Sequence, residues 1–192
     1  MKIERPKSKQ PLPEDAKKVF EGEIFDVYQW EQEMFDGSTA TFERLTRPAT
    51  LQVIAEVDGK IAMSDEEQPA KGRFLSLLGG RQEPNEDPLE GAKRELLEES
   101  GLVSDEWELW QTAEPYNKVV WTIYIYIARH CKKVEHPKHD AGEKITVKTY
   151  NFDEFIEATL SKEFCGHEVV EQILRMKLDP PKLEAFRKKI LG

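Results

Sequence analysis

The sequence predicts an α+β fold in which strands and helices are layered as an α/β/α sandwich. Two observations lead to this prediction: strand-like stretches lie on both sides of one strongly marked helix, and the remaining helical stretches gather at the C-terminal end. The chain has 192 residues, of which 39% are hydrophobic, and this is enough for one globular domain with a substantial core.

The N-terminal half is expected to form β-hairpins. Strand-like stretches are expected at residues 18–35, 39–47, 51–57, 60–64 and 74–78. Asp36-Gly37 joins the first two stretches and Asp58-Gly59 joins the next two, and Asp-Gly between strand-like runs is a strong signal for a tight turn. A mixed sheet preceded by an N-terminal β-hairpin region is therefore expected.

The central helix carries clear start and stop signals. Asp87 is expected to cap its N-terminus, Pro88 fits the first helical position, and Glu90 completes a D-x-x-E capping arrangement. Gly101 is well placed to end the helix in a left-handed turn. An apolar stripe for core packing is formed by Leu89, Ala92, Leu96 and Leu97.

The C-terminal half is expected to contain further strands and closing helices. Strands are expected at 107–112, 119–128 and 144–150, and helices from Asn151 or Asp153 to Leu160, at 166–176 and at 182–190. We predict an irregular arm at 1–17, one domain at 18–178 and a helical tail at 179–192, which begins at Asp179-Pro180-Pro181.

Composition limits the classes of partner. The formal net charge of −9 argues against binding to a nucleic acid polymer, whose phosphates need a basic surface. Residues 1–17 lack the apolar core of a signal peptide, and the longest apolar run, 119–128, is too short to span a bilayer. The two cysteines, Cys131 and Cys165, lack metal-type spacing and suit a reducing compartment, so we expect a cytoplasmic protein without a membrane partner.

Three carboxylates on the central helix point to a metal site. Glu95, Glu98 and Glu99 stand at i, i+3 and i+4, so they project from one face of the helix and repel one another. A hard divalent cation such as Mg²⁺ removes that repulsion, because it prefers oxygen ligands. Arg94 is spaced to pair with Glu90 or with Glu98, one turn away on either side. The alternative is an ordinary charged face exposed to solvent.

The segment from Gly80 to Leu102, GRQEPNEDPLEGAKRELLEESGL, decides between these alternatives. It matches every fixed position of the pattern G-x5-E-x7-R-E-U-x-E-E-x-G-U, where U is aliphatic, and the chain therefore resembles the Nudix hydrolases. The resemblance implies Glu95, Glu98 and Glu99 as metal ligands, Gly80 as a carbonyl ligand, and Arg94 as the residue that orients a glutamate. It also implies Glu86 as an outer member of the cluster and Mg²⁺ as the cofactor, with Mn²⁺ able to replace it. The glutamate that serves as base varies across the family, and the resemblance implies Glu95 or Glu98 for that role.

The layout of residues 18–176 is similar to the branch of the family that hydrolyses ADP-ribose and nucleoside-diphosphate sugars. That resemblance implies a homodimer formed with the N-terminal strands. Glu43 and Arg47 fall where the branch often has polar residues near substrate, although a solvated strand face is an alternative. The chain departs from the branch in two places: residues 76–80 replace a Glu-Leu-Pro-Ala-Gly run, and 67–70 replace a Gln-Tyr-Arg segment.

The expected function is Mg²⁺-dependent hydrolysis of a nucleoside diphosphate linked to a group X, with ADP-ribose or a nucleotide sugar as substrate. The products would be a nucleoside monophosphate and a sugar phosphate. The alternatives are hydrolysis of a noncanonical nucleoside triphosphate to its monophosphate, and binding of a nucleotide without turnover by a sensor.

Several residues outside the motif carry weaker hypotheses. Glu143 is either a further catalytic glutamate brought from a late loop or a solvated strand edge. Pro115 lies close to the position of a proline that often accompanies ADP-ribose specificity in the branch. His136 and His139 lie in a stretch that reads as an exposed loop, and they could contact a metal. Trp121, Tyr124 and Tyr126 lie on one expected strand, and one face of that strand could stack a nucleotide base.

Overall fold

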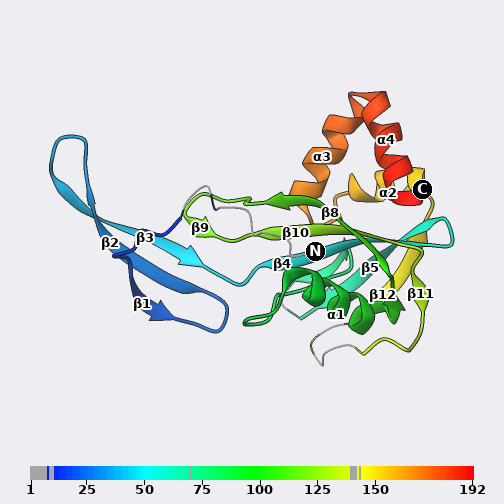
Figure 1. Cartoon of the computed structure of the whole chain (residues 1–192), viewed down its shortest axis with the longest axis horizontal. Helices are drawn as coiled ribbons and strands as arrows, with labels where there is room; N and C mark the ends of the chain where they lie inside the picture. The colour runs from blue at the N-terminus through cyan, green and yellow to red at the C-terminus, as the bar shows by residue number, and fades with distance from the viewer. Residues whose placement is uncertain (1–7, 9–10, 70, 139–141, 143) are drawn as a thin grey trace.

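We describe a computed structural model of the chain. It describes residues 8, 11–69, 71–138, 142 and 144–192. Figure 1 shows a body built around a twisted sheet, from which a long N-terminal ribbon of strands extends to one side.

The N-terminal ribbon is an antiparallel meander with a short parallel strand added at its end. In spatial order its strands are β1 (Lys17–Glu21), β2 (Asp26–Glu33), β3 (Thr39–Thr46) and β9 (Val119–Val120). The turn at Asp36-Gly37 is confirmed, with Gly37 at a φ of 78° and Asp36 Oδ1 accepting the Ser38 amide at 3.0 Å. The prediction of one strand over 18–35 was wrong, because the chain turns between β1 and β2, where the Gly22 amide donates to the Phe25 carbonyl.

The central sheet is mixed, as predicted. In spatial order its strands are β12 (Lys144–Tyr150), β5 (Lys60–Gln68), β4 (Thr50–Val57), β10 (Ile123–Arg129) and β8 (Glu106–Ala113), while β6 (Gly72–Ser76) pairs with β5. Only the pairing of β10 with β4 is parallel among these described strands. A separate small pair, β7 (Leu102–Val103) with β11 (Lys132–Lys133), was not predicted.

Helices cover both faces of the central sheet. Figure 1 shows α1 (Pro88–Ser100) below the sheet and α2 (Phe152–Thr159), α3 (His167–Lys177) and α4 (Pro180–Leu191) above it. Each face buries its own cluster of apolar side chains: Leu51, Tyr124 and Leu96 lie in the cluster under α1, and Ile125 and Phe155 lie in the cluster under the other helices. The predicted α/β/α layering is therefore confirmed.

The ends of α1 match their sequence signals. Asp87 Oδ1 accepts the Leu89 amide at 2.9 Å, Pro88 occupies the first turn, and Gly101 ends the helix in the left-handed conformation with a φ of 71°. The predicted role of Glu90 differs, because its carboxylate pairs with Lys93 at 2.8 Å. These caps fix where the helix starts and therefore which side chains face the sheet.

The C-terminal half differs from the prediction in detail. The stretch at 119–128 is divided into β9, which joins the ribbon, and β10, which joins the central sheet. Asn151 is the cap of α2, with a complete capping box to Glu154. Phe186 and Ile190 of α4 are buried in the core cluster above the sheet.

None of the described helices is long and apolar enough to cross a membrane. Cys131 is buried, Cys165 is exposed, and neither forms a disulfide.

Candidate active site

The loop that precedes α1 is held against the edge of β4. The backbone amides of Leu51 and Val53 donate to the carbonyls of Gly80 and Leu78 at 2.9 and 2.8 Å. Gly79 adopts a φ of 135°, and a Cβ there would stand 2.0 Å from the Leu51 carbonyl oxygen. Only glycine fits this close approach of two backbones, so the loop has a fixed position relative to α1.

Two glycines leave room for glutamates. A Cβ on Gly80 would lie 2.6 Å from Glu95 Oε2, and a Cβ on Gly91 would lie 2.5 Å from Glu86 Oε2. Because glycine has no side chain, the carboxylates of Glu95 and Glu86 lie directly against the backbone of Gly80 and Gly91. The glycine of the motif therefore leaves room for a carboxylate, while its own carbonyl accepts the Leu51 amide.

Arg94 joins the carboxylates of the site. Its Nε and Nη2 donate to the two oxygens of Glu86 at 2.8 and 3.1 Å, and its Nη1 donates to Glu95 Oε1 and to Glu98 Oε2, each at 2.9 Å. Nη2 also donates to the Arg81 carbonyl at 3.2 Å, which ties the helix to the loop. The predicted pairing with Glu98 is found, while Glu86 takes the place of Glu90 as the other main partner.

These contacts shift the titration of both partners. The hydrogen bonds from Arg94 lower the pKa of Glu86 below its ordinary value of 4.5, against the opposing effect of partial burial, and the Glu83 amide adds to this. In return, the Glu86 carboxylate raises the pKa of Arg94. Both groups are therefore charged at neutral pH.

A backbone amide of the loop before α1 holds Glu99. Its Oε2 accepts the Gly79 amide at 2.7 Å, and the residue is only 8% exposed. A buried carboxylate needs hydrogen bonds to remain charged, and the Gly79 amide supplies one of them. The loop and the helix thus position Glu99 by a direct bond.

The carboxylates of α1 open into one cavity of about 740 Å³. It lies between α1 and the loop, at the base of the N-terminal ribbon. Its lining residues include Glu95, Glu98, Glu99, Gly80 and Arg94, together with Arg47, Glu66, Gln68, Arg81 and Lys138. The structure therefore brings the motif residues together at a single concave surface.

Glu66 and Gln68 were missed by the sequence analysis. Glu66 is 6% exposed and accepts a hydrogen bond from the Ser64 hydroxyl at 2.5 Å. The predicted strand ended at residue 64, whereas β5 continues to Gln68. Because side chains alternate along a strand, extending it from Ala62 would have placed Glu66 and Gln68 on the face covered by α1.

The candidate residues outside the motif differ in where they lie in the structure. Glu143 and His139 lie outside the described residues, and His136 is exposed. Glu43 is exposed and accepts a hydrogen bond from Gln29 at 3.2 Å. Tyr124 and Tyr126 are buried in the cluster under α1, while Trp121 packs with the opposite cluster, as strand alternation predicted.

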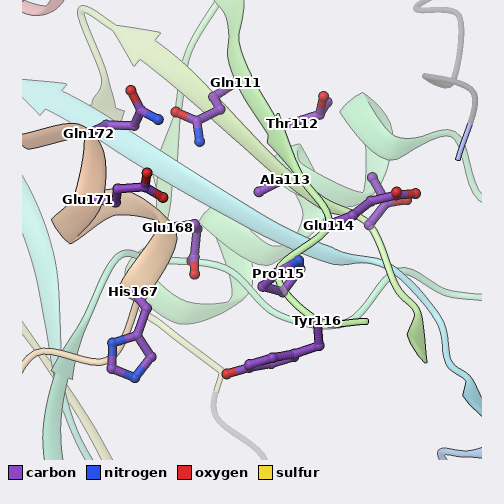
Figure 2. Close-up of a pocket in the computed structure, with 11 residues that line it drawn as sticks. Gln111, Thr112, Ala113, Glu114, Pro115, Tyr116, His167, Glu168, Glu171 and Gln172 are labelled. Carbon is purple, nitrogen blue, oxygen red and sulfur yellow. The ribbon is translucent and has the colours of Figure 1, made fainter. Parts of the chain in front are cut away.

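Pro115 lies in a different cavity from the carboxylates. That cavity, of about 510 Å³, is formed between the loop after β8 and the first turns of α3. Figure 2 shows Pro115 and Tyr116 on one side and His167 and Glu168 on the other. The carboxylate cavity contains none of these residues.

Several side chains that line the carboxylate cavity carry oxygen atoms, the type of ligand that a hard divalent cation prefers. Mg²⁺ prefers oxygen ligands, and the α1 glutamates and Gly80 line one cavity. Within the described residues, however, no three acidic, histidine or cysteine side chains are gathered as a metal site. Arg94 Nη1 donates to one oxygen of Glu95 and to one oxygen of Glu98.

Comparison with known proteins agrees with the geometry. An ADP-ribose pyrophosphatase of Bacillus subtilis (strain 168) is 24% identical over 151 residues, which cover 76% of this chain and 80% of that protein. A methanol dehydrogenase activator of Bacillus methanolicus is 25% identical over 167 residues, which cover 85% of this chain and 90% of that protein. A crystal structure of an ADP compounds hydrolase superposes with a TM-score of 0.70, at 18% identity, over 92% of this chain and 98% of that one, and so supports the fold.

A family model, the NUDIX domain, matches residues 45–171. This range is more than half of the chain and includes α1, the loop before it and every strand of the central sheet. The chain therefore belongs to the Nudix domain family and is a Nudix-type pyrophosphatase.

Proposed function

We propose that this enzyme hydrolyses the diphosphate bond of a nucleoside diphosphate linked to X, with ADP-ribose or a nucleotide sugar as substrate. The observation that carries the proposal is the convergence of Glu95, Glu98, Glu99 and Gly80 on one cavity. The names of the Bacillus subtilis relative and of the structural neighbour support a substrate that contains ADP.

We assign roles to the residues from their contacts and from the family pattern. Glu95, Glu98 and Glu99 would hold Mg²⁺, or Mn²⁺ in its place, with the Gly80 carbonyl as a further ligand. A bound divalent cation supplies charge neutralisation at the phosphate oxygens and lowers the pKa of a water molecule. Arg94 would fix Glu95 and Glu98 by its hydrogen bonds, and both residues line the cavity.

The reaction needs a general base that removes a proton from the attacking water. Glu95 or Glu98 would take a proton from the attacking water, and Glu143 is a further candidate from its place in the sequence. The water oxygen forms a new bond to one phosphorus while the bridging P–O bond breaks. The products are a nucleoside monophosphate and the phosphate ester of X.

Analysis of the reaction products distinguishes the proposed reaction from two alternative functions. A nucleoside triphosphate substrate would release inorganic pyrophosphate and one organic phosphate. The departures from the branch at residues 67–70 and 76–80 keep this alternative open. One relative is named as an activator of another enzyme, and tight nucleotide binding without product would favour a comparable binding role.

The test is incubation of the purified protein with Mg²⁺ and a panel of ADP-ribose, nucleotide sugars, dinucleotide polyphosphates and nucleoside triphosphates. Chromatography of the products identifies the bond that is cleaved. We expect AMP and ribose 5-phosphate, or the equivalent products of a nucleotide sugar. Full activity in both Glu98→Gln and Glu99→Gln would contradict the assigned site.

We also propose that the enzyme is a homodimer built on the N-terminal ribbon. Apolar side chains are exposed along this ribbon, including Phe20 at 58% and Phe42 at 39%, and Figure 1 shows the ribbon projecting away from the body. Large exposed apolar side chains that gather on one element are a feature of interaction sites. A second copy of the chain is the occupant that the similarity to the ADP-ribose branch favours. The free thiols of Cys131 and Cys165 support a cytoplasmic location.

A further inference from the structure

A second cavity, of about 440 Å³, lies between β5, β6, β12 and α2. Leu75, Tyr150 and Ala158 form its apolar wall, and all three pack against the core cluster under α2, α3 and α4. None of the described residues that line this cavity also lines the carboxylate cavity. It is therefore a separate concave surface, and the core fixes one of its walls.

Asp65, Arg73 and Lys148 form an ion cluster at this cavity. Asp65 is 8% exposed, and its two oxygens accept Arg73 Nε and Nη2 at 2.7 and 2.6 Å, while Lys148 Nζ donates to Oδ2 at 2.5 Å. The hydrogen bonds from Arg73 and Lys148 hold the pKa of Asp65 well below its ordinary value of 3.8. The cluster therefore carries one net positive charge, and each cation has further N–H groups that Asp65 does not use.

The loop after α2 adds two polar groups to the cavity. Ser161 Oγ is buried and has no hydrogen-bond partner among the described residues. Because a buried hydroxyl without a partner costs free energy, a ligand group that bonds to Ser161 is stabilised there. Glu163 lines the same cavity and is exposed, and its negative charge balances the positive charge of the ion cluster. The lining thus combines N–H donors, a carboxylate and a hydroxyl without a net charge.

We propose that this cavity binds an α-amino acid with an apolar side chain. The ligand carboxylate accepts hydrogen bonds from Arg73 and Lys148 and from the Ser161 hydroxyl. Its ammonium group donates to Glu163, and its side chain packs on the apolar wall. A zwitterion matches this lining, whereas Glu163 repels a simple anion and the two cations repel a simple cation. The inference does not rest on the proposed hydrolysis reaction.

Calorimetric titration of the purified protein with L-leucine and L-phenylalanine tests the inference. We expect both to bind, and glycine to bind at least about 10-fold more weakly because it cannot cover the apolar wall. Phenylpropionate lacks the ammonium group of phenylalanine, and phenylethylamine lacks its carboxylate. We expect each analogue to bind at least about 10-fold more weakly than phenylalanine, since each loses a hydrogen bond to a charged group. Equal binding of phenylalanine and either analogue would overturn the inference.

Two variants locate the bound amino acid. Ser161→Ala removes a hydroxyl without a described partner, so we expect unfolding at the wild-type temperature or above and about 3-fold to 10-fold weaker phenylalanine binding. Glu163→Gln should weaken binding of phenylalanine but not of phenylpropionate, which has no ammonium group. Glu157→Gln is the matched control, because Glu157 is an exposed glutamate of α2 that pairs with Lys177 at 2.9 Å and does not line the cavity. We expect wild-type affinity for it.

The competing explanation is that the ion cluster only holds β6 and β12 to β5, and that a water molecule satisfies Ser161. Absence of leucine and phenylalanine binding by the wild type at millimolar concentration would favour that explanation and overturn the inference. Equal affinity of the wild type, Ser161→Ala and Glu163→Gln would place the amino acid elsewhere and would also overturn it. These results do not depend on turnover of any nucleotide.

Discussion

Arg94 organises the site at the scale of single residues. It contacts Glu86, Glu95, Glu98 and the Arg81 carbonyl, so it links the helix face to the loop. Its guanidinium is mostly buried, with a side-chain exposure of 26%, which makes its ion pairs stronger than those of an open surface. Its Nη1 holds the Glu95 and Glu98 carboxylates beside one another.

Replacement of Arg94 by Gln is expected to lower both stability and turnover. We expect a loss of about 1–3 kcal/mol in the free energy of unfolding, because Glu86 and Glu95 lose a charged hydrogen-bond partner. Urea denaturation measures this change. Lys93→Gln on the same helix, whose exposed pair with Glu90 contributes little, should behave as wild type.

The pH dependence of stability gives a second test of Arg94. The pKa of Glu86 is lower in the folded chain than its ordinary value of 4.5, so the contribution of Glu86 is complete above about pH 4.5 and is lost as the pH falls through the lower folded value. In Arg94→Gln this part of the acid sensitivity should shrink. An identical dependence in both proteins between neutral pH and about pH 3 would contradict the assigned pairing.

Sequence reasoning identified the motif glutamates but not all of their neighbours. Spacing on a helix predicts contacts one turn away, which is why Glu98 was found as a partner of Arg94. Glu86 lies before the helix, and its contact with Arg94 depends on the path of the loop. Glu66 lies on β5 and was missed because the predicted strand ended at residue 64, whereas Arg47, directly after β3, was placed near substrate only by the family resemblance.

At the scale of elements, α1 and its flanking loops define the site. The caps at Asp87 and Gly101 were predictable because they follow from local backbone chemistry. The division of the first strand-like stretch at residues 22–25 and of 119–128 into β9 and β10 was not. The first break is a turn between two paired strands of the ribbon, and the second arises because β9 pairs with β3 of the ribbon while β10 joins the central sheet, which is a long-range choice.

Gly101→Ala is expected to destabilise the fold strongly. The residue has a φ of 71°, and a Cβ would stand 2.1 Å from the Glu135 carbonyl oxygen, so both strain and a backbone clash result. We expect a loss of at least about 1–3 kcal/mol in urea denaturation. Gly37→Ala shares the positive φ, at 78°, without a neighbour within 4 Å, and should cost less. Equal losses in the two variants would show that the contact with Glu135 is unimportant.

For the whole molecule, the N-terminal ribbon is the least self-contained part. Several of its large apolar side chains are exposed, whereas the central sheet is covered on both faces. The division into an arm at 1–17, a domain at 18–178 and a tail at 179–192 remains a prediction. Since Phe186 and Ile190 of α4 are buried in the core, we expect the tail to contribute to stability.

The proposed dimer is tested by light scattering after size-exclusion chromatography. We expect the wild type to have the mass of two chains, and Phe20→Ser combined with Phe42→Ser to shift it toward the mass of one chain. Leu178→Ser is the control, because Leu178 is 88% exposed but lies between α3 and α4 on the body. A wild-type mass of one chain at all concentrations would rule out the dimer.

The most direct test of the proposed chemistry is product analysis with ADP-ribose and Mg²⁺, comparing the wild type with Glu98→Gln. We predict AMP and ribose 5-phosphate from the wild type, and turnover reduced by at least about 100-fold in the variant, as expected for loss of a group that holds the metal or moves a proton. Equal turnover by the two proteins would contradict the assignment of the α1 carboxylates as the catalytic site.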